Sequence, residues 1–123
     1  MATLGVTTEG LGPDAVLVTL EGELAFGQAL TFDEALRKCE ERDAACIVLD
    51  LRNLTFIDSA GVSMLLVARR RSARAGRRIV IVEGPPAVRR LFAIAGLADA
   101  FELVPALPSE FREPARDSVV CGE

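Results

Sequence analysis

The stretch from Leu54 to Leu66, read L-T-F-I-D-S-A-G-V-S-M-L-L, changes its hydrophobic period at Asp58 and Ser59. Before this pair the apolar residues are packed together as in a buried strand, and after it they follow the i, i+3, i+4 spacing of a helix face. Asp and Ser are also the residue types that accept hydrogen bonds from the free N–H groups of a first helical turn. The pattern predicts a strand that leads directly into a helix, with a hydroxyl at the positive end of the helix dipole.

Strand and helix patterns alternate along the rest of the chain. Residues 15–20 are rich in β-branched side chains, and residues 45–51 are nearly continuously apolar, which is typical of a central strand covered on both faces. Residues 28–43 show a helical pattern, but Thr31 and Glu34 also fit a capping box, so this helix has two possible starts. The predicted strands are 2–8, 15–20, 45–51 with an extension at 54–57, 78–82 and 101–104, and residues 21–24 either extend or end the second of these. The predicted helices are 28–43, 59–75 and a segment from 84–86 to Gly96.

This order of elements predicts the fold class. Strands joined by helices of about a dozen residues require right-handed crossovers and a largely parallel sheet. We therefore expect a single α/β domain with a mixed, mainly parallel sheet of four or five strands flanked by helices. The inward positions are expected to be Leu30, Ala35, Leu36 and Cys39 in the first helix, Val62, Leu65, Leu66 and Ala73 in the second, and Val88, Leu91, Phe92 and Ala95 in the third.

The character of the sequence changes after Pro105. Pro105, Pro108 and Pro114, together with alternating charges, disfavour a packed helix in this part of the chain. The prediction is a domain at residues 1–105 and a flexible C-terminal tail at residues 106–123.

The composition excludes several classes of function. The chain has no histidine, which removes most metal sites and every histidine-dependent nucleophile, and its only lysine, Lys38, belongs to no P-loop motif. No catalytic residue, metal or cofactor is therefore expected. The three cysteines, Cys39, Cys46 and Cys121, form no CxxC pattern, and Cys46 opens an apolar run, as a small buried hydrophobe would.

Charge and hydropathy argue against nucleic-acid and membrane partners. Eight arginines fall between Arg69 and Arg90, but the chain as a whole has a net charge of −4 and no aromatics interleave with the arginines. The arginines are better explained as a solvated helix face that complements the helix dipole. No apolar run approaches the length of a membrane span, and no charged region followed by an apolar stretch opens the chain. We expect a cytoplasmic protein without nucleic-acid binding or direct membrane insertion.

The segment I-V-L-D-L-R-N-L-T-F-I-D-S-A-G-V at 47–62 resembles the signature segment of STAS domains, in particular that of bacterial anti-sigma factor antagonists. L-E-G-E-L at 20–24, P-P-A-V-R-R-L-F at 85–92 and A-G-L at 95–97 extend the resemblance over residues 5–104. It implies a protein that binds an anti-sigma factor with serine-kinase activity and so frees a sigma factor. It also implies that this kinase, which supplies the ATP, phosphorylates Ser59, and that a serine phosphatase resets the switch.

Several residues of this segment allow more than one reading. Ser59 could be a plain N-cap, or Asp58 could be the cap and leave the Ser59 hydroxyl free to react. Gly61 could let a partner backbone approach or could only relieve crowding against the sheet. Ser63 is expected to contact its own helix or solvent. The candidate recognition surface is the first turn of the helix with the loops near 24–26 and 83–86, and comprises Asp58, Ser59, Ala60, Gly61, Val62, Met64, Leu24, Ala25, Phe26, Gly84 and Pro85.

Other functions remain as alternatives or are disfavoured. The family pattern is usually G-E-L-D, and Ala25 stands where that Asp is expected near the serine. A STAS domain that is not phosphorylated, acting as a scaffold in a sensory complex or with a membrane transport system, is the second hypothesis; Ser59 would then be a cap. A receiver-like phospho-aspartate at Asp58 is disfavoured, because Glu21 and Glu23 are a poor acidic cluster and the late lysine is absent. Small-ligand binding has no sequence feature in its favour.

Overall fold

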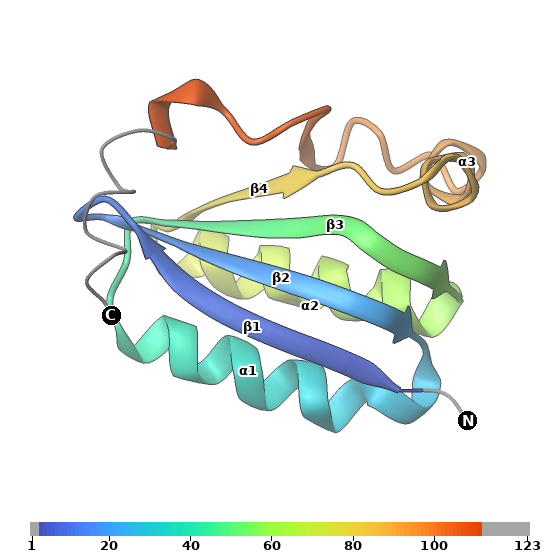
Figure 1. Ribbon diagram of the computed structural model, residues 1–123, viewed down its shortest axis with the longest axis horizontal. Helices are drawn as coiled ribbons and strands as arrows, with labels where there is room; N and C mark the ends of the chain where they lie inside the picture. Colours follow the sequence, from blue (N-terminus) through green and yellow to red (C-terminus); the bar gives the residue numbers. More distant parts are fainter. Residues whose placement is uncertain (1–2, 112–123) are drawn as a thin grey trace.

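The computed structural model describes residues 3–111, which form one five-stranded sheet and three α-helices (Figure 1). The strands lie in the order β1-β2-β3-β4-β5; β1 is antiparallel to β2, and every following pair is parallel. The predicted α/β fold with a mixed, mainly parallel sheet is confirmed. The elements are β1 Leu4–Leu11, β2 Ala15–Leu24, the 3₁₀ turn η1 Phe26–Gln28, α1 Ala29–Glu41, β3 Cys46–Ile57, α2 Ser59–Arg74, β4 Arg78–Val82, α3 Pro86–Ile94, β5 Glu102–Val104 and the 3₁₀ turn η2 Ser109–Phe111.

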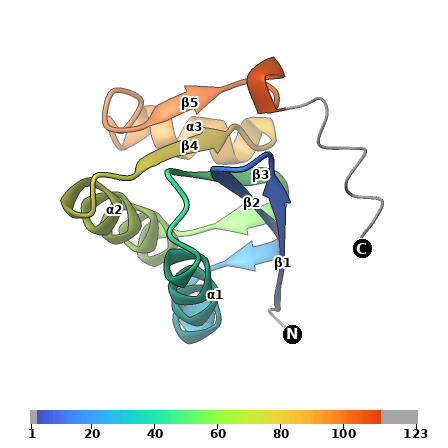
Figure 2. The ribbon, with the colours of Figure 1, turned by 90° about the vertical axis from the view of Figure 1, so that its left-hand side faces the viewer.

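The central strand β3 divides its side chains between two apolar layers. Ile47 and Leu49 join a core cluster that includes residues of all three helices. Cys46 and Val48 point to the opposite face, where they form a second cluster with residues such as Val80. Figure 2 shows α1 and α2 on the same side of the sheet, facing the first of these layers. Because both faces are covered, residues 46–51 are all buried, which confirms the interpretation of this apolar run.

The length of β3 positions the strand-to-helix junction. Its pairing with β4 ends at Asp50 and Val82, but its pairing with β2 continues to Leu24 and Ile57. The last part of β3 is therefore held on one side only, by β2. This single strand replaces the two predicted segments at 45–51 and 54–57.

The buried faces of the helices differ from the prediction at a few positions. In α1 the buried residues are Phe32, Leu36 and Cys39, whereas Leu30 is 69% exposed. The helix begins at Ala29, so the capping box at Thr31 is not formed. Leu30 lies about 200° around the helix from Phe32, and only one of the two can face the sheet.

In the other two helices, α2 and α3, the buried residues also differ from the prediction at single positions. In α2 the predicted inward residue Ala73 is exposed, and its neighbour Ser72 is completely buried instead. In α3 the predicted inward residue Ala95 is exposed, because the helix ends at Ile94 and Ala95 belongs to its C-terminal cap. The remaining predicted positions on these two helices, Val62, Leu65, Leu66, Val88, Leu91 and Phe92, are buried or half-buried.

The segment after Pro105 folds back onto the second face of the sheet. Leu107 and Phe111 pack against the cluster around Val48, and Glu110 forms an ion pair with Arg78 at 3.1 Å. Residues 107–111 of the predicted tail at 106–123 thus lie against the sheet, where their apolar side chains cover a layer that would otherwise face water. Residues 112–123, which include Cys121, lie outside the described residues.

Candidate functional site

The junction between β3 and α2 places Ser59 at the surface. Asp58 has an extended backbone, with φ −115° and ψ −173°, and its Oδ1 accepts a hydrogen bond from the Gly61 N–H at 2.9 Å. Its carbonyl oxygen accepts the first helical bond from the Val62 N–H at 3.0 Å. Asp58, and not Ser59, is thus the N-cap of α2. Ser59 is the first helical residue; it is exposed, and its hydroxyl makes no hydrogen bond to the part of the chain that the structure describes.

Gly61 allows the first turn of α2 to pack directly against the end of β2. A Cβ atom at this position would lie 2.1 Å from the Leu24 carbonyl oxygen and 2.8 Å from Ile57 Cγ1. The same Leu24 oxygen accepts a hydrogen bond from the Asp58 N–H at 3.4 Å. Glycine is needed here for a contact inside the domain, so the approach of a partner backbone does not explain it.

The loop after Leu24 is held by a residue that the sequence analysis missed. The Gln28 side chain is buried, and its Oε1 accepts a hydrogen bond from the Ala25 N–H at 3.2 Å. The Gln28 N–H donates to the Ala25 carbonyl oxygen at 2.9 Å, which closes the turn η1. This closed turn presents the Phe26 side chain to solvent, where it is 79% exposed. A polar residue directly before a helix was the only sequence signal for Gln28, and the local pattern did not show that its side chain is buried.

The candidate recognition residues do not all reach the surface. Leu24, Gly61 and Val62 are buried, because they connect the end of β2 to the core beneath α2. They support the site from beneath and offer no side chain to a partner. The candidates that remain exposed or half-buried are Asp58, Ser59, Ala60, Met64, Ala25, Phe26, Gly84 and Pro85.

The loop that carries Gly84 and Pro85 occupies a separate part of the sheet edge. A Cβ atom at Gly84 would lie 2.7 Å from the Leu51 carbonyl oxygen, so this loop adjoins β3 near its middle. Ser59 follows the end of β3, beyond Ile57. The second half of β3 therefore lies between this loop and Ser59.

An apolar groove between α1 and α2 begins beside Ser59. It has a volume of about 490 Å³, and Ala60, Ser63, Met64 and Val67 of α2 form one wall. These residues follow the i, i+3, i+4, i+7 spacing of one helix face, which was a usable signal in the sequence. Ser63 is exposed in this wall, as expected. The residues of the opposite wall and the ends are Phe26, Ala29, Phe32, Asp33, Leu36, Ala68 and Arg71.

Charged side chains close the far end of this groove. The Arg71 guanidinium pairs with Asp33 at 2.9 Å and with Glu40 at 2.9 Å, and so joins α2 to α1. Hydrogen bonds from Arg37 and from Arg71 lower the pKa of the Asp33 carboxyl. Hydrogen bonds to Glu40 and Asp33 raise the pKa of Arg71, so the charges of Arg71 and Asp33 persist at neutral pH.

Comparison with known proteins identifies the family to which this chain belongs. A model of the STAS domain matches residues 7–109, nearly the whole described chain. The chain belongs to the STAS domain family. Within residues 3–111 of this STAS domain, no helix is both long enough and apolar enough to span a membrane.

The relatives of this STAS domain include several anti-sigma factor antagonists. The anti-sigma F factor antagonist of Paenibacillus polymyxa is 32% identical over 101 residues, which covers 77% of this chain and 80% of that protein. Among solved structures, an anti-sigma factor antagonist from Mycobacterium paratuberculosis superimposes with a TM-score of 0.76 at 23% identity, covering 85% of this chain and 88% of that one. The antagonist SpoIIAA in its unphosphorylated form gives a TM-score of 0.69 at 21% identity, covering 97% and 98%. The phosphorylated form of SpoIIAA, from Bacillus, gives 0.67 at 22% identity, covering 94% and 99%.

Proposed function

We propose that this STAS domain is a cytoplasmic anti-sigma factor antagonist whose activity is switched off by phosphorylation of Ser59. It binds an anti-sigma factor that is also a serine kinase, and thereby frees a sigma factor. The kinase supplies ATP and phosphorylates Ser59, the complex separates, and a serine phosphatase restores the unmodified protein. The observation that carries this proposal is the exposed Ser59 hydroxyl at the first position of α2, next to an Asp58 side chain that already caps the helix.

The names of the relatives support the same proposal. The Paenibacillus polymyxa relative is an anti-sigma F factor antagonist, and SpoIIAA has been solved in both an unphosphorylated and a phosphorylated form. The phosphorylated form of SpoIIAA keeps the same fold, and the location of Ser59 at a helix N-terminus agrees with this. Phosphoserine adds about −1.5 to −2 charges. At a helix N-terminus the dipole and the free N–H groups favour such an anion.

The added charge would therefore act mainly on the partner. Ala60 and Ser63, both within one turn of Ser59, open the apolar groove between α1 and α2, and the exposed Phe26 ring lies at its rim. An apolar segment of the anti-sigma factor that fills this groove removes water from the surroundings of Ser59. A phosphate dianion at that edge then loses solvation without a matching charge, and the complex is weakened.

The test compares wild type with Ser59→Glu in affinity purification from native lysate, with bound proteins identified by mass spectrometry. Ser109→Glu is the matched control, because it adds the same charge at an exposed residue in η2, on another part of the molecule. Wild type and Ser109→Glu are expected to retain a small ATPase-like serine kinase that Ser59→Glu loses. Phosphate on Ser59 in the native protein, detected by the same instrument, would support the switch directly.

Two outcomes would contradict the proposal. If Ser59→Glu retained the same partners as wild type, Ser59 would be only a helix residue, and the scaffold role in a sensory complex or with a transport system would replace the switch. If Ser59→Asp lowered the melting temperature by tens of degrees, the loss of binding would reflect unfolding rather than charge at an intact surface.

A further inference from the structure

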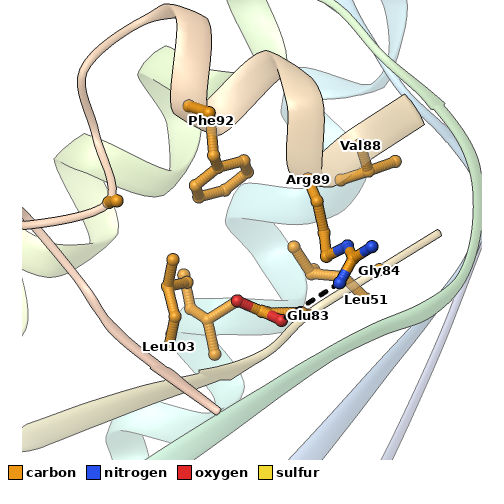
Figure 3. A pocket seen from close by; sticks show the side chains of 10 residues that line it. Leu51, Glu83, Gly84, Val88, Arg89, Phe92 and Leu103 are labelled. Carbon is orange, nitrogen blue, oxygen red and sulfur yellow. Dashed lines mark ion pairs between the residues drawn. The ribbon is translucent and has the colours of Figure 1, made fainter. Parts of the chain in front are cut away.

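A second cavity lies between α3 and the part of the sheet formed by β3, β4 and β5 (Figure 3). It has a volume of about 160 Å³, and none of the residues that line it belongs to α1 or α2. Its wall is mainly apolar, with Leu51 and Ile81 from the sheet, Val88 and Phe92 from α3, and Leu103 from β5. Because these residues come from four different elements, no local pattern in the sequence predicts the cavity.

Backbone contacts hold the walls of this cavity in place. A Cβ atom at Gly84 would lie 2.7 Å from the Leu51 carbonyl oxygen and 3.2 Å from Val88 Cβ, so the loop before α3 packs closely against both β3 and α3. The Glu83 N–H donates to the Val104 carbonyl oxygen at 2.9 Å, which joins the end of β4 to the end of β5. The cavity is thus formed by the fold itself, as small-molecule sites usually are.

Two opposite charges lie at this apolar cavity. Glu83 and Arg89 are the only ionisable residues that line it, and Arg89 Nη1 lies 4.0 Å from Glu83 Oε1. Figure 3 shows these two side chains facing each other beside the same space that the Phe92 ring and Leu103 face. At 4.0 Å the pair is longer than a direct charge-assisted hydrogen bond of about 2.8 Å, so each group retains capacity for another partner. The Glu83 side chain is 29% exposed and that of Arg89 is 55% exposed, which leaves both within reach of a ligand from solvent.

We propose that this cavity binds a free aliphatic α-amino acid. A cavity of about 150 Å³ with apolar walls accepts a molecule as large as benzene, so a side chain of four to six carbon atoms fits here. A ligand with only a carboxylate would meet Glu83 as well as Arg89, and a ligand with only an ammonium group would meet Arg89 as well as Glu83. A zwitterion matches both: its carboxylate pairs with Arg89 and its ammonium with Glu83, while the side chain lies against Phe92 and Leu103.

Titration of the ¹⁵N-labelled full chain with L-leucine, followed by backbone amide chemical shifts, tests this proposal. Saturable shifts are expected at Gly84, Val88, Phe92 and Leu103, with a dissociation constant on the order of 1 mM. Three further probes separate the contributions of the ligand: 4-methylpentanoate lacks the ammonium, isoamylamine lacks the carboxylate, and L-alanine lacks the long side chain. Each is expected to bind about tenfold more weakly than leucine.

Matched variants on α3 locate the binding. Ala93 and Ala87 are both exposed, but only Ala93 lines the cavity, so Ala93→Leu is expected to weaken leucine binding about tenfold while Ala87→Leu leaves it unchanged. Arg89→Gln is expected to abolish the preference for leucine over isoamylamine, and Arg90→Gln, an exposed neighbour outside the cavity, to keep it. The proposal is overturned if leucine causes no shifts at about tenfold above the expected constant. Equal binding of leucine and 4-methylpentanoate, or equal loss in both alanine variants, would also overturn it.

Discussion

Gly61 is the residue on which the geometry of the serine site depends most directly. Its replacement by alanine puts a Cβ atom 2.1 Å from the Leu24 carbonyl oxygen, which belongs to the backbone and cannot rotate away. We expect Gly61→Ala to lower the free energy of unfolding by about 3 kcal/mol, at the upper end of the cost of overpacking a core. Gly27→Ala is the control, because its Cβ meets no atom within 4 Å. Urea denaturation of both variants measures the difference, and equal stability would show that α2 can move away from β2 at little cost.

Asp50 is a buried carboxylate whose contribution to stability depends on pH. It is 4% exposed, and Arg52 donates to it from its backbone N–H, its Nε and its Nη2 at 2.9–3.0 Å. Burial alone would raise the pKa of Asp50, but the hydrogen bonds from Arg52 outweigh burial and lower it. A lowered folded-state pKa contributes stability above the unfolded-state pKa of about 3.9, and this contribution is lost as the pH falls through the folded-state value.

Asp50→Asn isolates this contribution. The variant is expected to lose about 2 kcal/mol at neutral pH, typical of hydrogen bonds to a charged group. The difference from wild type should stay constant above about pH 5 and shrink as the pH falls below about 4. Denaturant curves at a series of pH values provide the measurement, with the exposed Asp14→Asn as control. A difference that grows towards low pH would reverse the sign and contradict the lowered pKa.

At the scale of elements, Arg71 joins the two helices that form the apolar groove. Its side chain is 27% exposed and reaches Asp33 and both carboxylate oxygens of Glu40 on α1. Arg71→Ala is expected to cost about 1 kcal/mol in stability, and Arg71→Lys part of that, because an ammonium group cannot make the same fork of hydrogen bonds. Urea curves at low and high salt measure both effects, and screening should reduce the cost. The neighbouring Arg70→Ala should change little, since Arg70 is exposed; an equal loss there would indicate a general charge effect.

The elements themselves were largely predictable, whereas the details of their faces were not. The order of strands and helices follows from hydrophobic period, and the Asp58-Ser59 junction from a change of period with capping residues. Phe32 is buried in α1 and Leu30 is exposed, although both are apolar residues of the same predicted helix. The turn η1 before this helix is closed by the buried Gln28 side chain, which accepts a hydrogen bond from the Ala25 N–H, and the hydrophobic pattern does not show that contact. One wall of the groove follows the spacing of a helix face in α2, but its other wall lies on α1, and the residues of the Glu83–Arg89 cavity come from several elements, so no local pattern in the sequence contains either site as a whole.

At the scale of the whole molecule, the fold needs a cover for the face of the sheet that carries no α-helix. Val48 and Val80 on that face are completely buried, and Leu107 and Phe111 pack against their cluster. The segment at 107–111 is tied down by the η2 turn, in which the Phe111 N–H donates to the Pro108 carbonyl oxygen at 3.0 Å, and by the ion pair of Glu110 with Arg78. These contacts make the segment part of the domain, although its prolines and charges are typical of a tail.

Removal of the two apolar anchors tests this role. The double variant Leu107→Ala/Phe111→Ala is expected to lower the free energy of unfolding by about 2 kcal/mol, because both side chains are half-buried and each loses part of its burial energy. The midpoint of urea denaturation should fall while the slope stays near that of wild type, since the rest of the core is unchanged. Ile94→Ala is the control, because Ile94 is 75% exposed and its loss removes little buried area. A double variant as stable as Ile94→Ala would mean that the segment contributes nothing to the fold, and the domain would then end at β5, as the sequence pattern alone suggests.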